Sequence, residues 1–293
     1  MTVAEPPLET ADSIDFSLDE DQRAIREAAR EFARKEIDPI VEEFDEAQKF
    51  PAELMRQAGE LGFLGVLVPE EYGGAGLGYV EYYLIIDEIS RVDPSIGLSV
   101  AAHNSLCTNH ILKFGSEEQK RRWLPDLASG RKIGAWSLTE PDAGSDAAGT
   151  RSRAVRKDDG WLLNGAKTFA THATVGQICV VHEVTDPDGE KHHNISAFVL
   201  EEGMEGFRAG KKENKLGSRA SDTGEVIMED CFVSDEHLLG DAGEGFIQAL
   251  KILDGGRISI AALGVGTARG AFETALAYAK QREQFGKPIS KFQ

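Results

Sequence analysis

The chain carries little positive charge relative to its acidic content, and it lacks any long apolar run. Fifty Asp and Glu residues face 32 Lys and Arg, so the formal net charge is −18 at pH 7. This surplus disfavours nucleic acid as a partner, because phosphates are repelled. No uncharged apolar stretch reaches the roughly 20 residues of a membrane helix, so no membrane association is expected. Two interpretations of the charge stay open: an ordinary solvated acidic surface, or a high-salt cytoplasm that screens carboxylate repulsion.

Cysteine is also scarce. Cys107, Cys179 and Cys231 are widely spaced and form no CxxC pair. We therefore expect buried thiols in a reducing compartment, and neither a disulfide framework nor a zinc site. The seven histidines are scattered or directly adjacent, and we expect no metal site of any kind. The residues up to Asp12 include no basic residue and no apolar segment typical of a secretory signal, so a cytoplasmic location is expected.

The hydrophobic period divides the chain into three regions. Residues 1–130 have a mainly helical period, which begins at a candidate capping box from Ser17 to Glu20. Residues 131–244 contain short runs typical of strands, separated by turn dipeptides such as Asp159-Gly160, Asn164-Gly165 and Asp188-Gly189. The helical period returns over residues 245–293, with a second helix opening at Asp254–Arg257. The sequence predicts an α+β protein with an all-α N-terminal domain, a middle β-barrel or sandwich and a C-terminal helical domain.

Two glycine-rich stretches, Gly74–Gly78 and Gly264–Gly266, raise the possibility of a nicotinamide cofactor. Neither completes G-x-G-x-x-G, because the required positions hold Tyr79 and Arg269. Neither follows a strand in a βαβ unit. The first is better interpreted as a loop between helices and the second as a place of close helix packing.

The segments Leu138–Asp146 and Lys167–Thr171 carry a sharper signal. The first leaves an apolar strand and turns through Pro, Asp and Gly, so its backbone is free to bond a ligand. Taken alone it could be a plain turn capped by its own carboxylates. Together, both segments resemble the flavin-contacting signatures of the acyl-CoA dehydrogenase family, and a third segment, Tyr278–Pro288, resembles that family's helical signature. The resemblance extends from about Phe16 to Gln293, and it implies that residues 245–293 begin a four-helix bundle.

The resemblance implies FAD as the cofactor. In it, Leu138 and Thr139 bond the pyrimidine edge of the flavin, Phe169 packs against the ring and Thr171 lies near the reactive N5 atom. The chain departs from the family pattern twice, with Phe169 in place of a common Trp and His172 in place of a common Asn. The resemblance also places Trp136 and Ser145 in the flavin site. Ser145 would in addition touch the pantetheine arm of the thioester.

For the C-terminal segment the resemblance implies a site shared between subunits, and hence a homo-oligomer (a dimer or tetramer). The residues that would reach the neighbouring subunit's FAD are Arg282, Gln284, Phe285 and Gln293. The alternative for Arg282 is a surface ion pair with a nearby acid such as Glu283, with Gly286 as a helix stop.

Asp254 and Arg257 would contact the CoA moiety of the substrate. The alternative interpretation is an N-cap Asp254 followed by a solvated Arg257. The glycines between them, at 255 and 256, cost helix stability and suggest that another group approaches closely.

The reaction implied is α,β-dehydrogenation of a short or branched acyl-CoA to the trans-2-enoyl-CoA, with electrons passed to an electron-transfer flavoprotein. A carboxylate removes the α-proton in this chemistry. One family position for that base holds Gly256 here, and the other lies beyond Gln293, so no catalytic residue is expected within this chain. Two alternatives stay open: a flavin oxidase or monooxygenase on the same fold, and a non-catalytic protein that binds FAD or CoA without the base.

Overall fold

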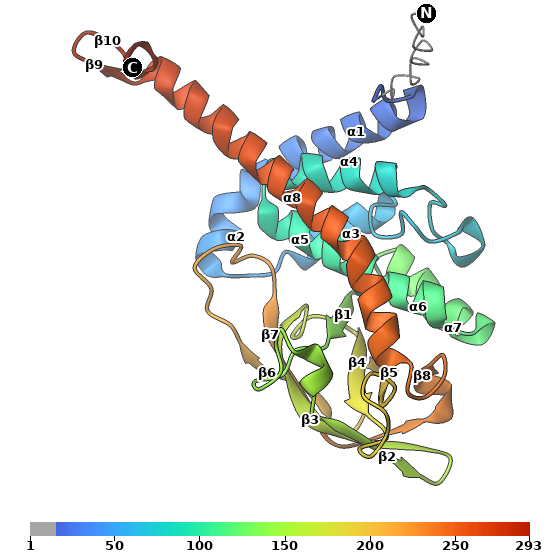
Figure 1. Cartoon of the computed structure of the whole chain (residues 1–293). Coiled ribbons are helices and arrows are strands. Elements are labelled where there is room, and N and C mark those ends of the chain that lie inside the picture. The colour runs from blue at the N-terminus through green and yellow to red at the C-terminus, as the bar shows by residue number, and fades with distance from the viewer. Residues whose placement is uncertain (1–15) are drawn as a thin grey trace, which may run out of the picture.

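The computed structural model describes residues 16–293, and the inference about a secretory signal before Asp12 lies outside them. Helices gather at one end, strands at the other, and one long helix, α8, crosses both and projects beyond the body (Figure 1). Ahead of the strands come α1 Glu20–Phe32, α2 Val41–Ala47, α3 Ala52–Glu60, α4 Tyr79–Ser90, α5 Pro94–Ala102, α6 Asn109–Phe114 and α7 Glu117–Ala128.

The first helix begins with a capping box, two residues later than the sequence suggested. Asp19 is the N-cap residue: its carboxylate accepts the backbone N–H of Gln22 at 2.8 Å, and the Gln22 side chain accepts the Asp19 N–H at 3.3 Å. The assignment of Ser17 and Glu20 as the box was therefore wrong. Both patterns place a polar acceptor three residues before an amide or acid, and the one nearer the apolar stripe formed the cap.

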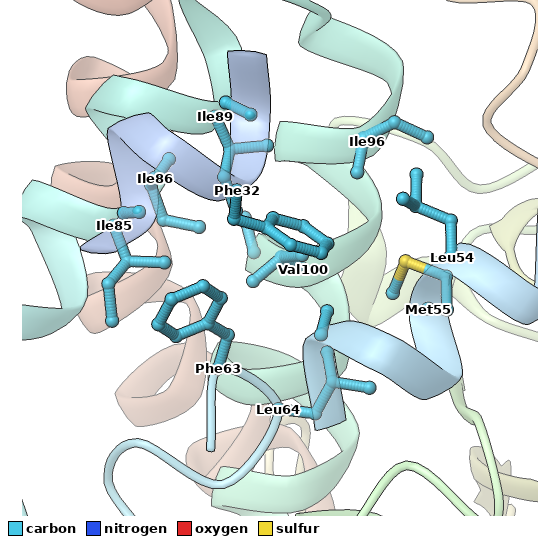
Figure 2. Packing of buried hydrophobic residues seen from close by; sticks show 14 of the residues in the cluster. Phe32, Leu54, Met55, Phe63, Leu64, Ile85, Ile86, Ile89, Ile96 and Val100 are labelled. Carbon is cyan, nitrogen blue, oxygen red and sulfur yellow. The ribbon is translucent and has the colours of Figure 1, made fainter. Parts of the chain in front are cut away.

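The helical end is held together by one apolar cluster. Phe32 of α1 meets Phe63 edge to face, with ring centroids 5.8 Å apart. Figure 2 shows these rings among aliphatic side chains that come from α3, α4 and α5. The segment before α4 forms the Gly-rich loop expected between helices. The cluster makes the N-terminal helices one packed body, as the helical period predicted.

The strands form one eight-stranded sheet in the order β6-β7-β3-β1-β4-β5-β8. Strand β2 pairs with both β3 and β4, which closes the sheet on itself. The predicted β-barrel architecture is therefore confirmed. The strands are β1 Gly134–Ser137, β2 Arg153–Lys157, β3 Gly160–Thr171, β4 Ile178–Val184, β5 Ile195–Glu201, β6 Phe207–Lys212, β7 Thr223–Ser234 and β8 Leu238–Leu239.

One predicted turn is absent from its expected place. Asn164-Gly165 does not separate two strands but lies within β3, at a register shift against β7. A side chain at Gly165 would collide with Ser152, so the glycine allows a neighbouring segment to approach. An Asn-Gly pair is compatible with a bulge as well as with a hairpin, and the long pairing with β7 selected the bulge.

Helix α8 runs without interruption over Gly245–Gln281, so the predicted break at Asp254–Arg257 was wrong. Packing against α4 and α5 compensates for the low helix propensity of the two glycines. Further along, a Cβ at Gly266 would collide with the carbonyl oxygen of Asp87 in α4. Glycine there permits the close helix packing that the sequence suggested for Gly264–Gly266.

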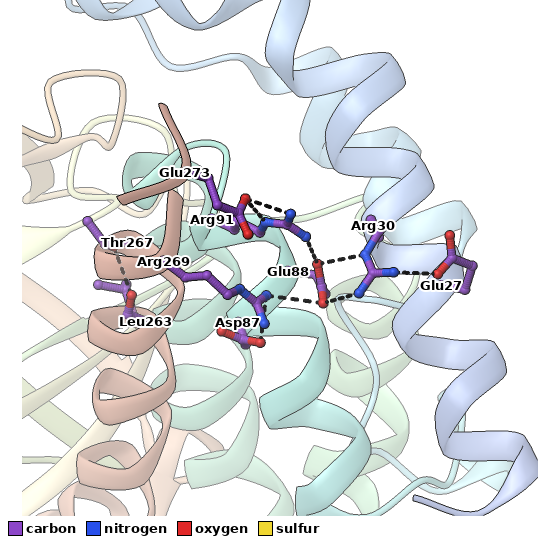
Figure 3. Close-up of polar contacts among 9 residues, drawn as sticks. All are labelled: Glu27, Arg30, Asp87, Glu88, Arg91, Leu263, Thr267, Arg269 and Glu273. Atoms are coloured by element: carbon purple, nitrogen blue, oxygen red, sulfur yellow. Dashed lines mark hydrogen bonds and ion pairs between the residues drawn. The ribbon is translucent and has the colours of Figure 1, made fainter. Parts of the chain in front are cut away.

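A network of charges joins α8 to the N-terminal helices. The Glu88 carboxylate, fully buried on α4, pairs with Arg30 of α1 at 2.9 Å and with Arg269 of α8 at 3.1 Å. Figure 3 shows Arg91 and Glu273 extending the same network along α8. Burial raises the pKa of Glu88, but the arginines outweigh this effect and lower it. Glu88 is therefore ionised at neutral pH and fixes the position of α8.

The chain ends in a small hairpin. Helix α8 stops at Gln281, five residues before Gly286, and β9 Glu283–Gln284 pairs with β10 Lys287–Pro288. Phe285 and Gly286 form the turn with φ values of 54° and 73°. Gly286 is thus a turn glycine and not the helix stop that was expected.

The three cysteines are free and buried, as predicted from their spacing. Among the helices of residues 16–293, none combines the length and the apolar character of a membrane span.

Candidate functional site

The two motif segments meet where β1 and β3 run side by side. Trp136 of β1 is the cross-strand partner of Thr171 at the end of β3. Beyond β1, the backbone N–H of Thr168 donates to the carbonyl oxygen of Thr139 at 2.8 Å. The structure therefore brings together the two loops that the sequence connected only by resemblance.

The first loop is a tight turn with its apolar end inside. Leu138 is buried, Thr139 is half-buried, and Glu140 forms an isolated bridge with Ala143. Ser145 lies further along, exposed to solvent. The turn thus presents backbone and hydroxyl groups at the surface while Leu138 anchors it in the core.

The second segment contains a distortion of β3. The register against β7 shifts between Lys167 and Ala170, and Phe169 takes a left-handed backbone with φ 57°. Its ring is 64% exposed. A large apolar ring that folding leaves in water fits a flat aromatic ligand such as the flavin of FAD.

Trp136 is buried, as Leu138 is, whereas Phe169 and Ser145 are exposed. The Trp136 side chain is 9% exposed, and its indole N–H donates to Nδ1 of His110 at 3.0 Å. Because that donor is occupied, Trp136 contributes to the region as a packing residue under the loop. His172 is fully buried, with Nδ1 2.9 Å from the carbonyl oxygen of Gly134.

A cavity of about 480 Å³ opens beside Thr171. Helix α8 contributes Arg257 to it, so two predicted site residues share one cavity. The wall is mostly apolar, and three of its small or apolar residues belong to α5, with two more from the π-helical turn His103–Thr108. Besides Thr171 and Arg257, the residues that line the cavity are Leu98, Ala101, Ala102, Ser105, Leu106, Leu253, Gly256 and Ile260.

Gly256 faces this cavity. A Cβ built there would lie 3.8 Å from Cδ2 of Leu106 and 3.9 Å from Oγ of Ser105. These are ordinary contact distances, so the close approach that was inferred from the two glycines does not occur. The glycine instead leaves room at the wall of the cavity.

Asp254 and Arg257 lie one turn apart on α8, with side chains 81% and 78% exposed and 4.0 Å between them. Asp254 stands mid-helix, so its interpretation as an N-cap was wrong. Arg257 lines the cavity, and its exposed charge, with that of Asp254 beside it, can meet a charged part of a ligand.

The C-terminal candidates lie elsewhere. The hairpin that carries them projects at the far end of α8, away from the barrel loops (Figure 1). Phe285 is 93% exposed and meets Phe292 edge to face. This chain does not bring these exposed residues to its own cavity: Arg282, Gln284, Phe285 and Gln293.

A buried charge cluster behind the first loop was not identified as such from sequence. Lys167, with no exposed surface, bonds Glu140 at 2.7 Å. Burial raises the pKa of Glu140, but Lys167 and hydrogen bonds from Ser152 and Thr150 outweigh it and lower the pKa to about 2. The sequence signal was an ionisable residue in each motif, although nothing in the spacing showed that they pair.

Comparison with known proteins agrees with this geometry. The model of the acyl-CoA dehydrogenase N-terminal domain matches residues 19–131, that of the middle domain residues 135–231 and that of the C-terminal domain residues 243–293. A short-chain specific acyl-CoA dehydrogenase of Clostridium acetobutylicum is 45% identical, over 96% of this chain and 74% of the relative.

Two solved structures are similar along most of their length. Butyryl-CoA dehydrogenase from Megasphaera elsdenii superposes with a TM-score of 0.92 at 40% identity, over 95% of this chain and 74% of that one. A chain from the structural work on the electron transferring flavoprotein of Acidaminococcus fermentans reaches a TM-score of 0.93 at 48% identity, over 95% and 73%.

Proposed function

The chain belongs to the acyl-CoA dehydrogenase family, and from that premise we propose that it catalyses FAD-dependent α,β-dehydrogenation of a short acyl-CoA thioester. Electrons then pass to an electron-transfer flavoprotein. The single observation that carries the proposal is the shared cavity, in which Thr171 of the motif strand and Arg257 of α8 line one apolar space. Relatives that act on butyryl-CoA or are short-chain specific support a short acyl group.

Bound FAD supplies the hydride acceptor. The chain's own residues bind and orient it: Leu138 and Thr139 offer backbone and hydroxyl groups to the pyrimidine edge, and Phe169 covers the ring. Thr171 positions the reactive face beside the cavity. Ser145 completes the loop and touches the pantetheine arm, while Trp136 supports it from within.

The acyl group occupies the apolar cavity, and the CoA moiety extends past Asp254 and Arg257. An apolar lining that excludes water strengthens hydrogen bonds to the thioester carbonyl. Those bonds stabilise the negative charge that develops on the carbonyl oxygen when the α-proton leaves. Among residues 16–293, those that line the cavity include no carboxylate. We therefore propose that the base comes from a residue outside this lining.

The protein is further proposed to act as a homo-oligomer, a dimer or tetramer. Arg282, Gln284, Phe285 and Gln293 lie exposed on the projecting hairpin, where they can reach a second subunit's cofactor. The arginine suits a pyrophosphate because its charge and planar donors are fixed. The corresponding division into domains is 1–130, 131–244 and 245–293, and the proposed location is the cytoplasm.

Spectroscopy of the FAD-loaded protein tests the activity. A four-carbon acyl-CoA is expected to perturb or bleach the flavin band at lower concentration than a sixteen-carbon one. A flavin band that responds to neither thioester would contradict the proposed substrate class. Rapid reoxidation of the reduced flavin by oxygen would favour the oxidase alternative instead.

A further inference from the structure

A buried ion pair flanks the hydrogen bond that joins the two flavin-contacting segments. Thr139 and Thr168 are linked through their backbones, and the next residue along one segment, Glu140, pairs with the residue before the other, Lys167. The Lys167 side chain has no exposed surface and that of Glu140 is 6% exposed. A charge pair this deep usually stabilises a fold less than apolar side chains of the same volume would. Its position therefore points to a role besides stability.

The Glu140 carboxylate joins the two ends of the loop formed by residues 140–152. Besides the bond from Lys167, it accepts hydrogen bonds from the hydroxyl of Thr150, from the backbone N–H of Arg151 at 2.7 Å and from that of Ser152 at 3.0 Å. One side chain thus closes the loop from residue 140 to residues 150–152. Ser145, predicted to contact the thioester arm, lies inside the loop that this carboxylate closes.

Lys167 fixes the other segment from inside the barrel. Its ammonium also donates to the hydroxyl of Thr150 at 3.1 Å and to the carbonyl oxygen of His182. In a regular strand residues 167 and 169 would face the same side, yet Lys167 is buried and Phe169 is exposed. The register shift that separates them begins directly after Lys167. The anchored ammonium thus sits at the start of the distortion that turns Phe169 outward.

We propose that Glu140 and Lys167 are positioning residues that set the geometry of the FAD site by holding the Leu138–Asp146 loop against the distorted end of β3. The proposal rests on the function proposed above, since it assigns these segments to the flavin. The lowered pKa of Glu140 agrees with it, because a carboxylate that stays ionised keeps all of its acceptor bonds.

A third charge in the same cluster provides a matched control. Glu183 of β4, fully buried, lies 3.4 Å from Lys167 Nζ. Within the described chain neither of its oxygens accepts a well-formed hydrogen bond, so Glu183 makes none to the loop. Glu183 therefore contacts the Lys167 ammonium, as Glu140 does, but has no proposed role in holding the loop.

The test compares Glu140→Gln with Glu183→Gln, each in the full chain titrated with FAD. Both exchanges keep shape and remove one buried carboxylate. An amide at position 140 can no longer accept from every partner of the native carboxylate, so the loop loosens. Glu140→Gln is expected to weaken FAD binding about tenfold and to shift the flavin absorption spectrum. Glu183→Gln is expected to stay within about twofold of the parent protein with an unchanged spectrum.

The melting temperatures of the FAD-free variants show whether each one is folded at the temperature of the titration, so that weaker FAD binding by a folded variant is not mistaken for unfolding. If both variants bind FAD like the parent, or if both weaken binding equally, the assignment is overturned. Should Glu140→Gln not fold, Thr150→Val decides instead, because it removes the hydroxyl bridging the pair and is expected to weaken FAD binding in the same direction. An unaltered affinity in Thr150→Val would then overturn the assignment. A parent protein that binds no FAD would refute the proposed function itself, which is a different result.

Discussion

The backbone N–H of Thr168 bonds the carbonyl oxygen of Thr139 at 2.8 Å, and this bond joins two segments that are 29 positions apart in the chain. It makes the loop after β1 and the distorted end of β3 one surface. Removing either segment's anchor is therefore expected to disturb both, which several measurements can check.

The buried ammonium of Lys167 is expected to stabilise the fold by pairing with Glu140. Lys167→Met leaves Glu140 ionised and unpaired inside the barrel, and the free energy of unfolding is expected to fall by about 3–5 kcal/mol. Urea denaturation of the FAD-free protein measures this. Lys157→Met, at an exposed position of β2, is the control and is expected to change stability by less than about 0.5 kcal/mol. Equal effects of the two substitutions would contradict the prediction.

Acid is expected to destabilise the protein through its buried histidines, at a higher pH than that at which an ordinary carboxylate titrates. Burial, with a smaller contribution from His172, lowers the pKa of His103 to about 3, and burial lowers that of His110 to about 4. The unfolded chain therefore binds these protons first, so stability falls as pH drops below about 6.5, by about 1.4 kcal/mol per pH unit for each histidine.

Protonation of Glu183 has the opposite effect on the change of stability with pH. Burial raises its pKa to about 7, against the attraction of Lys167, so the native state takes up a proton first and gains stability as pH falls from 7. Glu183→Gln should accordingly steepen the acid-induced loss of stability, as measured by urea denaturation between pH 7.5 and about 5. A stability that is flat over this range in both proteins would be inconsistent with neutral buried histidines.

The glycines of α8 differ in their consequences. Gly266→Ala places a methyl group against the Asp87 carbonyl and is expected to cost about 1–3 kcal/mol. Gly264→Ala, where no atom of the described residues lies within 4 Å of the added Cβ, is expected to gain about 1 kcal/mol through helix propensity. Thermal denaturation of both variants decides the matter. A stabilising Gly266→Ala would mean that α8 does not pack on α4 as described.

Gly256 lines the cavity proposed for the acyl group and belongs to neither segment proposed to contact the flavin. Gly256→Leu fills the space beside Leu106 and is expected to weaken binding of a four-carbon acyl-CoA about tenfold while leaving FAD affinity unchanged. Gly264→Leu, on the same helix outside the cavity, is the matched control. If Gly256→Leu binds the thioester as tightly as its control does, the acyl group lies elsewhere.

Local patterns in the sequence predicted most of the architecture. The strands at 178–184 and 195–201 follow from short, mainly apolar runs, because both of their faces are buried. The helices of the first 130 residues follow from apolar residues spaced three or four apart, because burial of one face favours that spacing. The continuous α8 could not be predicted, since tertiary packing compensated for two glycines that locally disfavour a helix.

The site divides in the same way. Thr139, Phe169 and Thr171 could be predicted as flavin residues because motif resemblance is local, and the structure brings their two segments together. The pairing of Glu140 with Lys167, 27 residues apart, depends on how β1 and β3 align, which no local pattern encodes. The apolar residues lining the cavity were missed for the same reason, because they look like ordinary core residues of a helix.

The central claim is that FAD binds where the barrel loops meet, with Phe169 against its ring. An equilibrium titration with FAD of the parent protein and of Phe169→Ser tests this most directly, because an exposed side chain can be changed with little effect on folding. The account predicts that the parent retains flavin through gel filtration and that Phe169→Ser binds it about tenfold more weakly. A parent protein that emerges colourless, or a variant that binds FAD equally well, would contradict it.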